Sequence, residues 1–87
     1  MATRDSVQHC LDHCEEAILS AQTEYDKASL QEHRNDEQFT QAQLQLEQAF
    51  MDLEKLMKSA NEEQEDTLQR KKLKIQEMQN KMQVLRH

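Results

Sequence analysis

The sequence predicts an all-α protein, and three observations lead to this prediction. The 87 residues include no glycine and no proline, although strand-rich folds depend on such residues for their turns. The abundant residues are strong helix formers, and β-branched residues are few. Apolar residues also recur at helical spacing along most of the chain. We therefore expect long helices joined by polar turns, within a single helical domain over residues 1–87.

The first segment has apolar residues at alternating spacings of four and three. This is the a/d pattern of a helix with one apolar seam. Asp5 with Gln8 three residues later is typical of a capping box, and the pattern fades at Glu32. We expect a helix over about residues 5–33, with a seam made of Val7, Leu11, Cys14, Ile18, Ala21, Tyr25 and Ala28.

A second segment repeats the pattern after a turn expected at about residues 33–35. Asn35 with Gln38 indicates the cap of a helix over about 36–60. Phe50 and Met57 widen the apolar stripe on one side. The seam itself consists of Phe39, Ala42, Leu46, Ala49, Leu53, Leu56 and Ala60.

The third segment follows six polar residues, 61–66, and its seam is displaced by one residue from the earlier frame. That seam consists of Leu68, Lys71, Ile75, Met78, Met82 and Leu85. One interpretation places a turn in 59–66, with Ser59, Asn61 or Asp66 as the cap of a helix over about 62–87. The other interpretation is a single long helix that absorbs a local irregularity.

Helix length favours the turn. Three helices of roughly 33–42 Å would lie side by side as an antiparallel three-helix bundle. A continuous helix over 36–87 would be roughly 77 Å long, and half of it would lack an intramolecular partner. The alternative fold is therefore a long two-helix coiled-coil hairpin that dimerises. Oligomeric state stays open, and a homo-oligomer is compatible with either arrangement.

Charge is distributed unevenly along the chain. Residues 1–66 hold 16 acidic and 5 basic residues, a net charge of −11, whereas residues 67–87 hold 1 acidic and 6 basic residues, a net charge of +5. The simpler interpretation is that a basic third helix packs on two acidic ones. The other is a basic amphipathic helix that binds an anionic surface, through Arg70, Lys71, Lys72, Lys74 and Lys81.

One cluster of candidate metal ligands occurs, formed by His9, Cys10, His13 and Cys14. Two or three of these side chains would lie close enough on one helix to bind a borderline ion such as zinc. Structural zinc sites usually take ligands from two separate elements, and Cys14 falls on the apolar seam. We therefore interpret the cysteines as small buried residues and expect no metal site and no cofactor.

No other motif indicates catalysis. The sequence has no glycine-rich phosphate loop and no nucleophile elbow, and the Glu-x-x-His pattern of di-iron bundles is missing. No signal peptide and no stretch of about 20 apolar residues is present. We therefore expect a cytoplasmic protein that is not an enzyme and that binds neither membrane nor nucleic acid.

Several short stretches are shared with a known family. They are Met1-Ala2-Thr3-Arg4-x-Ser6-Val7, Gln31-Glu32-His33, Phe39-Thr40-x-Ala42-Gln43-x-x-Leu46-Glu47 and Ser59-Ala60-Asn61-x-x-Gln64. With these residues the chain resembles the YtzC-like family of small proteins from bacilli. The resemblance implies a bacillar, cytoplasmic origin, and it assigns no activity and no functional residue.

The leading functional hypothesis is a small helical interaction or structural module. It would bind another protein, or a second copy of itself, through the apolar seam. The alternatives are a metal- or thiol-dependent sensor that uses His9, Cys10, His13 and Cys14, and a peripheral binder of anionic surfaces that uses residues 67–87.

Overall fold

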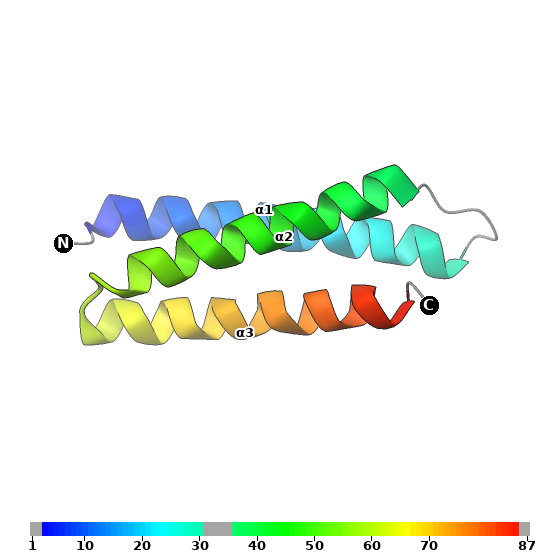
Figure 1. Cartoon of the computed structure of the whole chain (residues 1–87). Helices are drawn as coiled ribbons and strands as arrows, with labels where there is room; N and C mark the ends of the chain where they lie inside the picture. Colours follow the sequence, from blue (N-terminus) through cyan, green and yellow to red (C-terminus); the bar gives the residue numbers. More distant parts are fainter. Residues whose placement is uncertain (1–2, 31–35, 86–87) are drawn as a thin grey trace.

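The computed structural model describes residues 3–30 and 36–85, and within them it contains three helices and no strand. These helices are α1 (Arg4–Leu30), α2 (Asp36–Met57) and α3 (Glu62–Leu85). They run alternately up and down along one another as an elongated bundle of 46 × 18 × 15 Å (Figure 1). Each helix contacts both others. The all-α prediction is confirmed, and the long hairpin is wrong because α2 and α3 are separate helices.

Helix α1 begins earlier than the sequence predicted. The Thr3 hydroxyl, rather than Asp5, caps the helix: it accepts a hydrogen bond from the Ser6 amide at 3.0 Å. The Val7 amide then donates to the Thr3 carbonyl at 3.0 Å. Asp5 lies instead within the first turn, where its negative charge is favourable at the helix N-terminus. Helix α1 ends at Leu30, and the turn predicted at 33–35 lies outside the described residues, as does the Asn35 cap.

The connection between α2 and α3 confirms the turn predicted within 59–66. Helix α2 ends at Met57, three residues before the expected end, and the amides of Ser59 and Ala60 close the last turn with i→i−3 bonds. Asn61 caps α3 as a capping box. Its side chain accepts from the Gln64 amide at 2.8 Å, and the Gln64 side chain accepts from the Asn61 amide at 3.1 Å. These bonds satisfy backbone donors that would otherwise lack partners.

The core is a single hydrophobic cluster to which all three helices contribute. Leu46, Leu53, Leu68 and Ile75 are fully buried at its centre. Most predicted seam residues lie in this cluster, and Leu11, Ile18, Tyr25, Ala28, Leu56, Ala60 and Leu85 are partly buried against it. The seams of the three helices therefore bury one another within one chain.

Helices α1 and α2 meet through small side chains. The buried residues of α1 include Cys14, Ala17 and Ala21, and those of α2 include Ala42 and Ala49. Small contact residues allow two helix axes to approach closely. The Cys14 thiol accordingly lies 3.9 Å from the backbone carbonyl of Ala49, to which it donates a weak hydrogen bond.

Helix α3 places its larger side chains, Leu68, Ile75, Met78 and Met82, against the other two helices. Lys71 occupies a predicted seam position without breaking the core. Its stem lies half-buried while its ammonium reaches Glu15 of α1 at 2.8 Å, as long basic side chains do at the edge of apolar surfaces. In the described part of the chain, none of the helices is long and apolar enough to cross a membrane.

Candidate functional site

The predicted His/Cys cluster lies near the N-terminal end of α1, where this helix faces the C-terminal half of α2. A surface hollow of about 380 Å³ is lined there by Ser6, His9, Cys10, His13, Asp52 and Leu56. Asp52 comes from α2, and no sequence motif links it to the α1 residues that line the hollow. Cys14 does not line the hollow, since its side chain is buried in the core.

The environment of both thiols opposes ionisation. The pKa of Cys14 is raised to about 12, mainly by burial and also by the neighbouring Cys10, while Lys71 has a smaller, lowering effect. Burial also raises the pKa of Cys10, although a hydrogen bond with Cys14 offsets part of this effect. Because the thiolate is the reactive and metal-binding form of cysteine, both residues remain protonated thiols near neutral pH. This chemistry does not favour a thiol-based sensor.

The geometry of the cluster adds no support for a metal centre. Within residues 3–30 and 36–85, no three His, Cys, Asp or Glu side chains are grouped so that they could hold an ion. His9 and His13 are exposed on the rim of the hollow, and Cys14 lies on the other side of Cys10, in the core. The structure thus brings His9, Cys10 and His13 to one hollow and leaves Cys14 out of it. Metal binding at this cluster stays an untested hypothesis.

Two basic residues of α3 form ion pairs with the other helices of the bundle. Lys71 pairs with Glu15 of α1, and Lys72 pairs with Glu54 of α2 at 3.3 Å. The ammonium of Lys72 also lies 5.4 Å from the centre of the Phe50 ring. Lys71 stabilises the ionised form of Glu15 and so lowers the pKa of that carboxyl group.

Two more basic side chains of α3 also have neighbours within the chain. Lys81 lies 6.0 Å from the centre of the Tyr25 ring, and Arg70 pairs with Asp66 one turn away on the same helix at 3.2 Å. The contacts of Lys71, Lys72 and Lys81 with the other two helices favour a packed third helix over a free helix that binds anionic surfaces.

A different surface stands out on α2. Leu44 and Met51 are 57% and 54% exposed although both are large and apolar. Leu44 precedes the fully buried Leu46 by two residues, and Met51 precedes the fully buried Leu53 by two residues. Two residues correspond to a rotation of about 200° around the helix, so Leu44 and Met51 lie on the side opposite the core. With their exposed neighbours they form a second heptad row that points away from the core. We call this row the α2 outer face; it consists of Gln41, Leu44, Gln48, Met51 and Lys55.

The central part of the α2 outer face is poor in charge. Glu47 is the one charged residue in the stretch 38–51 of a chain in which 32% of residues are charged. The other large exposed apolar side chains of the described residues are spread over α1 and α3, as Leu19, Leu30, Leu73 and Val84. Scattered single side chains of this kind are normal on a protein surface. Leu44 and Met51 differ because they lie on one helix face only two turns apart, within a stretch that has a single charged residue.

The fold places the chain among small all-α bundle proteins. Residues 1–84 match the family described as "Protein of unknown function (DUF2524)", and the chain belongs to this family. It is 44% identical over 87 residues to the "Uncharacterized protein YtzC" of Bacillus subtilis (strain 168), covering 100% of this chain and 96% of that protein. The resemblance seen in the sequence is thereby confirmed. No solved structure matches the chain.

Proposed function

We propose that the protein is a non-catalytic helical module that binds another protein chain through the α2 outer face. One observation carries this proposal: Leu44 and Met51 are exposed two turns apart on one face of α2, and the stretch 38–51 that contains them has Glu47 as its one charged residue. Exposed apolar side chains in an uncharged surround are typical of the centre of a protein interface, where charged residues are depleted and methionine is enriched.

The proposed surface differs from the seam that the sequence suggested. The seam residues of all three helices are buried in one intramolecular core, so a partner that used them would have to open the bundle. The outer face of α2 is accessible without any such change. Binding through it therefore costs none of the core's stability.

The composition of the remaining surface supports the same choice. The exposed face of α1 carries Asp5, Asp12, Glu16 and Asp26 around Leu19, which keeps that leucine among solvated charges. On α3, Leu73 stands beside the charged residues Lys72 and Lys74. We expect the module to act in the cytoplasm, where thiols such as the free Cys10 and Cys14 stay reduced.

The test is affinity capture from the native cells with the tagged full-length protein and two matched variants. Leu44→Glu places a charge in the centre of the α2 outer face. Leu19→Glu makes the same change at a leucine of equal exposure, 58%, on α1. We expect a bound chain that is retained by the Leu19→Glu variant and lost with Leu44→Glu.

Two results would contradict the proposed function. One is a partner that Leu44→Glu and Leu19→Glu retain equally well. The other is the absence of any bound chain, including a second copy of the protein itself. Circular dichroism of both variants checks that they are folded, as expected for changes at exposed positions.

A further inference from the structure

We infer that the partner on the α2 outer face is a second copy of this chain, bound with the two α2 helices antiparallel. This inference rests on the proposed function and names its partner. Three features of the described residues lead to it: the spacing of Leu44 and Met51, the charges at the two ends of α2, and the absence of strong charge between them.

The apolar pair is self-complementary. Leu44 and Met51 are seven residues apart, so a two-fold axis midway between residues 47 and 48 brings Leu44 of each copy opposite Met51 of the other. The same axis places Glu47 opposite Gln48 of the second copy and keeps the two Glu47 carboxylates out of register. A closed two-fold contact of this type uses the same patch on both subunits.

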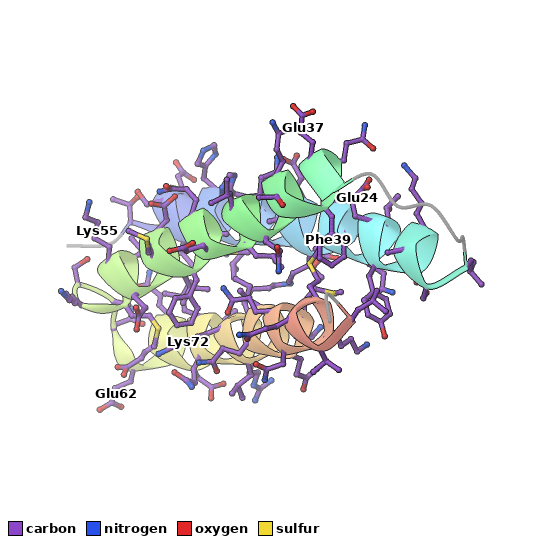
Figure 2. The ribbon with its side chains drawn as sticks, turned by 45° about the vertical axis from the view of Figure 1, so that its right-hand side comes forward. Glu24, Glu37, Phe39, Lys55, Glu62 and Lys72 are labelled. Carbon is purple, nitrogen blue, oxygen red and sulfur yellow. The ribbon has the colours of Figure 1, made fainter. Side chains whose placement is uncertain are left out.

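The charges at the ends of α2 are also self-complementary. Glu37 is exposed near the start of the helix, and Lys55 and Lys58 are exposed near its end. Glu37 and Lys55 both point outward, away from α3 (Figure 2). Eighteen residues of helix separate them, which is about 27 Å. No ion pair within the described residues involves these three side chains.

An antiparallel pair sets the basic end of one α2 against the acidic end of the other. With the axis between residues 47 and 48, Glu37 lies opposite Lys58 of the second copy, and Lys55 of that copy is one turn away. Each dimer contains this arrangement twice. Antiparallel α2 helices also align their dipoles favourably.

The net charge of the chain favours a second copy of the chain, rather than a basic protein, as the partner on the α2 outer face. The chain has a formal net charge of −6, and its acidic side chains line the outer face of α1, where a basic partner would be attracted. Two copies of an acidic chain repel each other least through a surface that has almost no charge. The α2 outer face is that surface.

The predicted dimer is weak. Each copy contributes only Leu44 and Met51 as large apolar groups, and stable interfaces usually bury about 1,200–2,000 Å² in total. The purified full-length protein should therefore be mostly dimeric at about 100 µM and monomeric at about 1 µM, the range in which weak contacts dissociate.

Sedimentation velocity over this concentration range tests the inference. We expect Leu44→Glu to abolish the dimer and the matched Leu19→Glu to leave it unchanged. Lys58→Glu and Glu37→Lys should each raise the dissociation constant about 3–10-fold at low salt, because like charges then face each other. The variant that carries both changes should recover most of the wild-type affinity, since the pair between positions 37 and 58 is restored with its sign reversed.

Three outcomes would overturn the inference. They are a wild-type protein that is monomeric throughout, a Leu19→Glu variant as impaired as Leu44→Glu, and a double charge reversal that restores nothing. A monomeric wild type that still captures a different protein in a Leu44-dependent way overturns the dimer alone. A monomeric wild type without such capture overturns both the dimer and the proposed function.

Discussion

Two leucines of α2, separated by one residue, have opposite environments. Leu46 is fully buried between the three helices, and Leu44 is 57% exposed on the α2 outer face. The heptad spacing of the sequence separates them, because Leu46 is in frame with Phe39, Ala42 and Leu53 and Leu44 is not. The same residue type therefore contributes to the core at one position and to a surface row at the other.

Replacing these leucines should give very different losses of stability. Leu46→Ala removes buried methyl groups and leaves a cavity, so it should lower the free energy of unfolding by about 2–4 kcal/mol. Leu44→Ala should cost less than about 1 kcal/mol, as for most exposed positions. Urea denaturation measures both values under the same conditions. Equal losses would show that the apolar face of α2 is wrongly assigned.

The buried thiol of Cys14 gives stability a specific dependence on pH. Its folded-state pKa is raised to about 12, so the folded state holds the proton more tightly than the unfolded state. The contribution of this group is therefore complete below its ordinary pKa and is lost as pH rises toward 12.

We expect the wild-type protein to lose more stability between about pH 8 and about pH 10 than the Cys14→Ala variant does. The variant is less stable at every pH because of the cavity, so the informative quantity is the change with pH. Urea denaturation at the two pH values measures it. An equal change in both proteins would mean that the thiol is not shielded from water.

The sequence predicted most core residues, but it missed one core residue, the cap of α1 and one residue of the His/Cys hollow. Ala17 is 3% exposed and lies outside the a/d seam, because a helix in a three-helix bundle has two neighbours and needs a wider apolar stripe than a coiled-coil pair. Thr3 was missed as the cap because Asp5 offers the same chemistry two residues later. Asp52 was missed at the His/Cys hollow because only tertiary packing brings it there.

At the scale of elements, the turn between α2 and α3 decides the fold. The chain makes this turn without glycine, and no described residue has a positive φ. Its stability depends instead on side-chain caps, with Ser59 bonding back to the Leu56 carbonyl at 3.3 Å and Asn61 starting α3. The one-residue displacement of the apolar seam after residues 61–66 correctly indicated this turn, although it did not show which polar residue is the cap.

Removing the cap should destabilise the bundle measurably. Asn61→Ala deletes the acceptor for the Gln64 amide and should cost about 1 kcal/mol, within the usual range of about 0.5–2 kcal/mol. Gln69→Ala, at an exposed position further along α3, is the control and should change stability by less than about 0.5 kcal/mol. The comparison uses urea denaturation. An Asn61→Ala variant as stable as the control would show that another residue caps α3.

At the scale of the whole molecule, the packing of the three helices both pairs opposite charges and buries apolar side chains. The basic side chains Lys71 and Lys72 of α3 reach acidic partners on α1 and α2, so the opposite net charges of the two parts of the sequence meet within one chain. Exposed ion pairs contribute only about 0–1 kcal/mol each. The buried cluster of apolar residues is therefore what holds the three helices together.

The central claim is that one chain buries its own seam and leaves the α2 outer face free. The most direct test is the urea midpoint of the wild-type protein at several protein concentrations, all within the range of about 1–10 µM where the weak dimer is dissociated. A seam that closes within one chain gives a midpoint independent of concentration. A midpoint that rises with concentration over this range would show that the core is formed between chains, as in a dimeric hairpin, and would contradict the account.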